Sequence, residues 1–113
     1  MALLAAEACI HLGEAEQLAA LFLNGIMAYC SSISQSGSDH VLIFDGSKAI
    51  IRVGHERIWL RVEADDLTLR LGTKTLIEAE LSKHTGEMPN CLLWIETDHD
   101  PFEAITELED KGL

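Results

Sequence analysis

The feature that most constrains the fold is a strictly alternating segment in the middle of the chain. From Arg57 to Ala64, the apolar residues Ile58, Leu60 and Val62 alternate with polar or amphipathic ones. Successive side chains of a β-strand point to opposite faces of a sheet, so this segment is predicted to be a strand with one buried face. A lone strand is not stable in water, and this one needs other strands beside it and an apolar layer packed against it.

Neighbouring segments are expected to complete an antiparallel meander over residues 40–72. Each combines β-branched residues or leucines with a turn signal at its end, such as Asp45-Gly46 or Asp65-Asp66. Besides residues 57–64, strands are expected over residues 41–44, 48–53, 67–72 and 91–96. Together they predict a sheet of about five strands.

Residues 14–30 are the longest helix candidate, because apolar side chains recur along them at helical spacing. The predicted fold class is therefore α+β. We expect an antiparallel β-meander of about five strands with a long N-terminal helix packed on one face and two shorter helices, in a single domain over residues 1–113.

Further helices are expected where Ala-rich or capping patterns occur. These are residues 2–12, a short helix from the capping box Thr75-x-x-Glu78 to near Gly86, and a last helix from Asp100-Pro101 to Gly112. The polar stretch 31–38 is expected to be a loop.

The acidic composition disfavours several classes of partner. The chain carries 19 acidic and 8 basic residues, a net charge of −11. Phosphate contacts need clustered lysines and arginines, so we expect no nucleic-acid binding. An anionic membrane surface is disfavoured for the same reason. No apolar run reaches the ~18 residues of a membrane-spanning helix.

The chain is expected to be cytoplasmic and free of cofactors. No Lys or Arg precedes Lys48, so the apolar start lacks the positive region of a signal peptide. Cys9, Cys30 and Cys91 are widely spaced, which is typical of reduced thiols. No histidine, cysteine and aspartate set has metal-ligand spacing, and no catalytic motif is present. We expect neither a metal site nor a cofactor, and a binding role is favoured over an enzymatic one.

The helix candidate 14–30 has more apolar surface than packing on one sheet requires. Phe22 and Ile26 lie on one apolar face, and Leu23 and Met27 lie on a second. Two interpretations stay open for the second face. Either the other helices cover it, or it is a subunit interface or docking surface, which makes Leu23 and Met27 candidate partner-binding residues.

A second candidate site lies on the polar side of the predicted sheet, where five residues are expected to share one face. They are Arg52, Arg57, Trp59, Arg61 and Arg70. A Trp between two arginines is the type of anchor that dominates protein interfaces. The same group could stack on a nucleobase, or the arginine stems and the acidic last helix could simply shelter Trp59.

The acidic C-terminal stretch is a third feature, because residues 96–110 contain seven acidic residues and no Lys or Arg. A helix face exposed to solvent explains this composition. Recognition of a basic partner surface is the alternative interpretation.

These features favour a small acidic protein-binding regulator, of the inhibitor, immunity or anti-activator type, that forms a homodimer. In size, acidity and helix–strand alternation the chain resembles the bacterial secretion chaperones, which are dimeric, although their number and order of strands differ. That resemblance implies a chaperone as the alternative within the same class. The alternative outside it is a small enzyme or ligand-binding domain with a pocket between helix 14–30 and the sheet.

Overall fold

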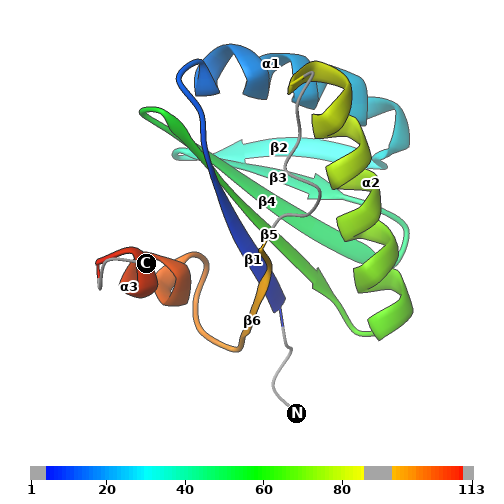
Figure 1. Cartoon of the computed structure of the whole chain (residues 1–113). Coiled ribbons are helices and arrows are strands. Elements are labelled where there is room, and N and C mark those ends of the chain that lie inside the picture. The colour runs from blue at the N-terminus through cyan, green and yellow to red at the C-terminus, as the bar shows by residue number, and fades with distance from the viewer. Residues whose placement is uncertain (1–4, 86–92, 111–113) are drawn as a thin grey trace.

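The computed structural model describes residues 5–85 and 93–110, and within them six strands form one antiparallel sheet (Figure 1). The strands are β1 (Ala5–His11), β2 (Ser32–Ser36), β3 (Asp39–Ile43), β4 (Ser47–Gly54), β5 (Arg57–Ala64) and β6 (Ile95–Thr97). The helices are α1 (Ala15–Ile26), the single 3-10 turn η1 (Met27–Tyr29), α2 (Leu67–Thr85) and α3 (Glu103–Asp110). The strand order is β2-β3-β4-β5-β1-β6, so β2 and β6 are the two edges.

Helices cover both faces of this sheet. Figure 1 shows α1 and α2 against one face and α3 against the other. The main core lies under α1 and α2, where Phe22, Ile26, Ile51 and Leu60 are fully buried. A smaller cluster lies under α3. None of the helices in the described ranges combines the length and apolar character needed to span a bilayer.

The antiparallel meander is confirmed in its central part. The strand predicted for residues 57–64 is β5, and the strands predicted for 41–44 and 48–53 are β3 and β4 with small shifts at their ends. The expected α+β class is also confirmed. The sheet has six strands rather than about five, because two segments predicted as helix or loop are strands and one predicted strand, over residues 67–72, is helical.

The prediction of a helix over residues 2–12 is wrong for the part that the structure describes. Ala5–His11 is strand β1, which pairs antiparallel with β5 and with β6. Its small residues Ala6 and Ala8 are buried on the face that carries α1 and α2, whereas Glu7 points to the other face. Alanine favours helices in isolation, but the free β5 edge provides a partner that outweighs this local preference.

The strand predicted for residues 67–72 is wrong, because one helix, α2, spans Leu67–Thr85. The helix predicted from Thr75 to near Gly86 is the second part of α2, so its end is confirmed and its start is not. Asp66 caps it, since its Oδ1 accepts hydrogen bonds from the backbone N–H groups of Thr68 at 2.6 Å and Leu69 at 3.4 Å. The Thr75 hydroxyl donates to the carbonyl of Leu71 inside the helix, so the expected capping box does not mark its start.

Three smaller expectations are corrected in the same way. The stretch 31–38 holds the edge strand β2 rather than only a loop. The longest described helix is α2, with 19 residues against 12 in α1, and α1 follows a strand instead of opening the chain. The strand predicted for 91–96 is β6, shorter and shifted, with residues 91–92 outside the described ranges. The last helix is confirmed as α3, but it starts at Glu103 rather than at Asp100-Pro101, and its expected end near Gly112 lies outside the described residues.

Candidate functional site

Four of the five residues expected on the polar side of the sheet do share that face. Arg57, Trp59 and Arg61 alternate along β5, and Arg52 of β4 pairs with Trp59 in the register. Arg70 does not belong with them, because it lies in α2 on the opposite face, where it is buried and contacts Glu96 at 3.0 Å. The expectation of five residues on one face was wrong because residues 67–72 are helical.

Arg61 is part of a buried ion pair with Glu7. Its Nη1 donates to Glu7 Oε2 at 2.6 Å and its Nε donates to Glu63 Oε2 at 2.6 Å. Arg61 is 5% exposed and Glu7 is 0% exposed. Burial acts to lower the pKa of Arg61, but the hydrogen bonds to Glu63 and Glu7 outweigh it and raise that pKa, so the guanidinium stays charged.

The Glu7 carboxylate also links the segment before α3 to the sheet by a hydrogen bond. Glu7 Oε2 also accepts the backbone N–H of Phe102 at 2.6 Å, and Arg61 Nη2 donates to the carbonyl of His99 at 3.1 Å. Phe102 and Ile105 then pack on Ile50 in the cluster under α3. Phe102 and Ile105 therefore face the sheet, and α3 covers part of the face that carries Arg52, Trp59 and Arg61.

The other two arginines of this face have intramolecular contacts as well. Arg52 forms a two-pronged ion pair with Asp39, at 2.6 and 2.9 Å, and lies 4.8 Å from the ring centre of Phe102. The hydrogen bond to Asp39 raises the pKa of Arg52. The Arg57 guanidinium lies 5.4 Å from the ring centre of Trp59, which is a cation–π contact. These contacts favour a sheltered Trp59, and its role as a partner anchor stays a prediction.

Trp59 is half-buried beside the cluster of Ile50, Phe102 and Ile105. We therefore expect Trp59→Ala to lower the free energy of unfolding by about 1.5–3 kcal/mol, because it removes a large side chain from a packed cluster. Chemical denaturation followed by circular dichroism measures this loss. An unchanged unfolding midpoint would show that α3 does not pack on Trp59 in solution.

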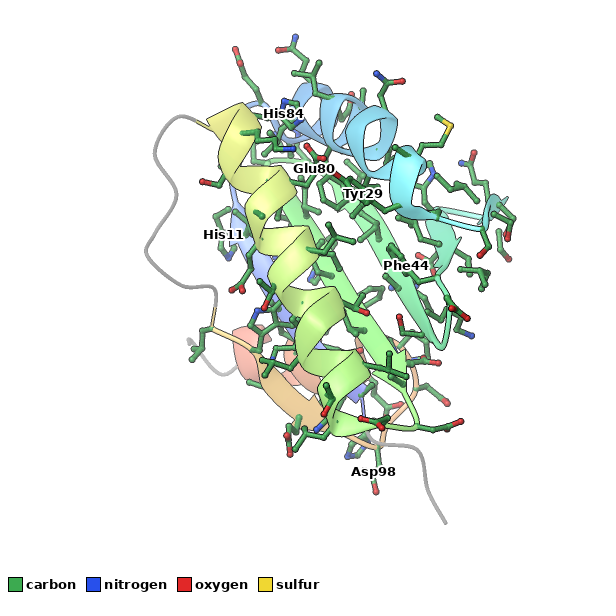
Figure 2. The ribbon with its side chains drawn as sticks, turned by 90° about the vertical axis from the view of Figure 1, so that its right-hand side faces the viewer. His11, Tyr29, Phe44, Glu80, His84 and Asp98 are labelled. Carbon is green, nitrogen blue, oxygen red and sulfur yellow. The ribbon has the colours of Figure 1, made fainter. Side chains whose placement is uncertain are left out.

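Helices α1 and α2 contact each other on the face of the sheet that carries the main core. Figure 2 shows Glu80 and His84 close together at the end of α2 that lies beside α1. A Cβ at Gly25 would lie 2.8 Å from Glu80 Oε2, so a larger residue at this position would displace the Glu80 carboxylate. The space between α1 and the sheet is filled by buried side chains such as Phe22 and Ile51, which disfavours a ligand pocket there.

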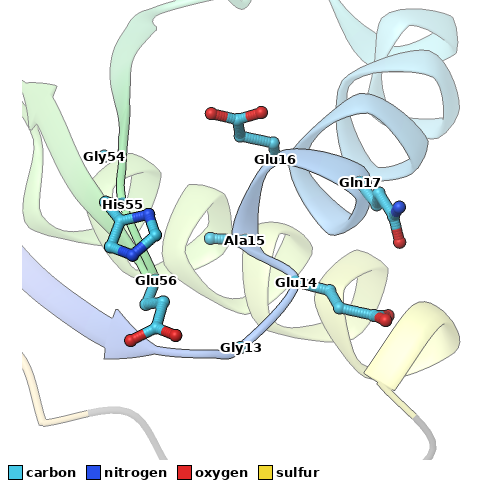
Figure 3. A pocket seen from close by; sticks show the side chains of 8 residues that line it. All are labelled: Gly13, Glu14, Ala15, Glu16, Gln17, Gly54, His55 and Glu56. Atoms are coloured by element: carbon cyan, nitrogen blue, oxygen red, sulfur yellow. The ribbon is translucent and has the colours of Figure 1, made fainter.

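Open pockets lie instead around Gly13, where β1 leads into α1. One, of about 250 Å³, lies between Glu14, Glu16 and Gln17 on one side and the β4–β5 turn on the other (Figure 3). That turn contains His55 and Glu56 and is fixed by a hydrogen bond from the N–H of Leu12 to the Glu56 carbonyl at 2.9 Å. Among the side chains that the structure describes, no three from His, Cys, Asp or Glu are placed to hold a metal ion.

The clearest functional signal is a segment without charge. From Gln17 to Ser38 the sequence has no Asp, Glu, Lys, Arg or His, although 24% of the whole chain is charged. Burial raises the pKa of the Cys30 thiol, so this side chain also stays neutral near neutral pH. The segment forms most of α1, all of η1 and β2, and the turn after it. We call the exposed side chains of residues 17–38 the charge-free surface.

Large apolar side chains are exposed on the charge-free surface. Leu21 and Met27 are each 53% exposed and Tyr29 is 54% exposed. Leu21 also lines a groove of about 340 Å³ whose other side chains include Glu14 and His84. Leu23, the other helix residue chosen from the sequence, is half-buried against the core. Exposed leucines also occur on α2, at positions 67, 69 and 71, but charged residues such as Asp66 and Lys74 lie among them.

The outer edge of β2, the strand that follows α1 and η1 in the chain, is unprotected. β2 is Ser-Ile-Ser-Gln-Ser, four of its five residues are exposed, and no strand in the described residues pairs with its outer edge. Natural proteins usually block such an edge with lysine, proline or a bulge, because its free N–H and C=O groups pair with other strands. β2 contains no charged residue and no proline.

The fold is similar to a solved structure of distant sequence. The NMR structure of PA4090 from Pseudomonas aeruginosa aligns with a TM-score of 0.65 and 6% sequence identity, over 80% of this chain and 94% of that chain. At this identity the likeness shows the fold alone. The sequence matches no protein-family model, and no curated protein matches it.

Of the residues chosen from the sequence, Met27 lies on the charge-free surface and is exposed, whereas Arg61 and Arg70 are buried in ion pairs. The sequence reasoning missed β2 and Tyr29. The absence of charge from residue 17 to residue 38 could have revealed both, because it crosses the boundary between the predicted helix and the predicted loop.

Proposed function

We propose that this protein is a small protein-binding regulator, of the inhibitor, immunity or anti-activator type, that acts by protein–protein contact through its charge-free surface. The observation that carries the proposal is the exposure of Leu21, Met27 and Tyr29 on a surface without charge in a chain of net charge −11. The centres of protein interfaces are depleted of charged residues and enriched in Met and aromatic side chains.

The energetic argument follows from burial. Each of these three side chains leaves about half of its surface in water, and transferring apolar area out of water stabilises a complex by roughly 25 cal/mol per Å² before the costs of association. A docked partner needs no compensating charge along residues 17–38. Desolvation of ionic groups, the largest penalty at many interfaces, is therefore absent at the centre of this one.

Acidic side chains border the surface and bear on the choice of partner. Glu14 and Glu16 lie immediately before it, in the loop and first turn of α1, and both are exposed. Such a rim attracts a partner with a basic surface and speeds association at low ionic strength. We therefore propose a partner with an apolar patch bordered by basic residues.

The test compares two variants of matched chemistry. Met27→Glu places a charge on the charge-free surface, and Leu71→Glu places the same charge on α2, where the native side chain is 58% exposed. Wild type and both variants are immobilised at equal density and exposed to a lysate of the native host. We expect a stoichiometric protein to bind wild type and Leu71→Glu and to be absent from Met27→Glu.

Thermal unfolding of both variants is the control for folding, since exposed substitutions should leave the melting curve nearly unchanged. A captured protein that binds Met27→Glu as well as wild type would contradict the proposal, and so would equal loss in both variants.

A further inference from the structure

We propose that the edge strand β2 pairs with β2 of a second copy of this chain, antiparallel about a two-fold axis at Ser34, and joins two sheets into one. This inference rests on the proposed function, since it names one occupant of the charge-free surface. It assigns the strand edge to the second copy, and the apolar side chains of α1 and η1 remain available to another partner.

Electrostatic repulsion limits where two copies of this chain can meet. Each copy has a net charge of −11, and like-charge contacts across an interface are costly. Residues 17–38 are the longest stretch of the sequence without Asp, Glu, Lys, Arg or His. Pairing through β2 brings two neutral segments together and keeps the acidic helix α3, which lies against the sheet, away from the strand edge.

The sequence of β2 is self-complementary for this pairing. In an antiparallel arrangement centred on Ser34, Ser32 lies opposite Ser36 of the second copy, and Ser34 lies opposite itself. The β2–β3 register places the side chains of Ser32, Ser34 and Ser36 on one face and those of Ile33 and Gln35 on the other. Three serine pairs would then line one face, where hydroxyl groups hydrogen-bond across strands.

The edge itself provides the main-chain partners. Ser34 and Gln35 are exposed, and the outer N–H and C=O groups of β2 have no strand to pair with in the described residues. A stable interface buries about 1,000 Å² or more in total, which five paired residues do not reach alone. We therefore expect a weak, concentration-dependent dimer, in which the exposed side chains of Met27 and Tyr29 stay outside the interface.

The first test uses Ser34→Lys, with Ser82→Lys on the exposed surface of α2 as matched control. The two-fold axis places the two introduced ammonium groups opposite each other, so we expect the dimer Kd to rise at least about tenfold in sedimentation velocity. Wild type and the Ser82→Lys variant should sediment as dimers at tens of micromolar. A monomeric wild type, or a dimer that Ser34→Lys leaves intact, would overturn the proposal.

The second test reads the register and does not depend on weakening the dimer. Opposed side chains of an antiparallel pair are close enough for a disulfide. Under mild oxidation, Ser34→Cys should give a covalent dimer, Ser32→Cys alone should not, and the double variant Ser32→Cys with Ser36→Cys should. The wild-type chain provides the baseline for its three native cysteines. Equal cross-linking of Ser34→Cys and Ser32→Cys would overturn the proposed register.

The two proposals can fail separately. A monomeric wild type whose partner is lost in Met27→Glu would overturn the dimer and leave the proposed function standing. A β2-paired dimer that captures no other protein would overturn the proposed function and leave the proposed dimer standing.

Discussion

Replacing Glu7 by alanine should lower the free energy of unfolding by about 3–5 kcal/mol, because it removes one partner of a buried ion pair. Glu7 is fully buried, and its Oε2 accepts both Arg61 Nη1 and the N–H of Phe102 at 2.6 Å. The variant leaves Arg61 with Glu63 as its remaining carboxylate and Phe102 with a buried N–H that lacks this acceptor. Urea denaturation followed by circular dichroism measures the change.

The control is Asp39→Ala, which breaks the Arg52–Asp39 pair nearer the surface. The Arg52 side chain is 37% exposed and that of Asp39 is 20% exposed. Solvent screens a pair of this kind, so we expect its loss to cost no more than about 1 kcal/mol. Equal losses for Glu7→Ala and Asp39→Ala would show that the Glu7–Arg61 pair is not buried in the folded protein.

Phe102→Ala should release α3 from the sheet. Phe102 is 2% exposed and fills the cluster with Ile50 and Ile105, and truncating a buried Phe costs about 3–5 kcal/mol. The described contacts between α3 and the sheet are few, so most of this cost should fall on α3 rather than on the core under α1 and α2. Hydrogen exchange should show faster exchange of the α3 amides and little change in β4 and β5.

A second substitution at the same position separates side-chain packing from backbone strain. Phe102 has a φ of +64°, in the left-handed region that disfavours residues other than glycine by about 1–2 kcal/mol. Phe102→Gly should therefore destabilise α3 less than Phe102→Ala, although glycine fills even less of the cluster than alanine. A larger loss for glycine than for alanine would contradict the left-handed geometry at this turn.

The central strands were predictable because β5 alternates strictly and because β3 and β4 combine β-branched residues or leucines with turn signals at their ends. Ile58, Leu60 and Val62 face the core and Arg61 faces α3, as the period of two requires. β1 was not predictable in the same way, because its buried residues are mainly alanines, which are small and favour helices. Its strand conformation depends on pairing with β5, which lies about 50 residues away in the sequence.

The first part of α2 was predicted as a strand because its leucines alternate with polar residues. Leu67, Leu69 and Leu71 alternate with polar residues, yet all three are exposed in the helix, 69%, 41% and 58% respectively. Helix α2 buries Ile77 and Leu81 instead, and Asp66 fixes its start. Alternating leucines after an Asp cap are compatible with a strand and with a helix. The helix forms because α2 packs against α1 and β5.

The candidate site was only partly predictable for a related reason. Hydropathy placed Met27 with Leu23 on a second apolar face of one long helix; Met27 lies instead in η1 and is 53% exposed, whereas Leu23 packs against the core. The arginines were harder to interpret, because the acids that pair with them come from distant positions. Glu7 lies 54 residues from Arg61 in the sequence, and no local pattern connects them.

The affinity of the purified partner for wild type, Met27→Glu and Leu71→Glu tests the central claim most directly. Isothermal titration calorimetry at one salt concentration measures all three. If residues 17–38 form the docking surface, Met27→Glu should bind at least about 30-fold more weakly than wild type, as expected for a charge buried at an interface centre, while Leu71→Glu stays within about threefold. Equal affinities of Met27→Glu and wild type would contradict the account.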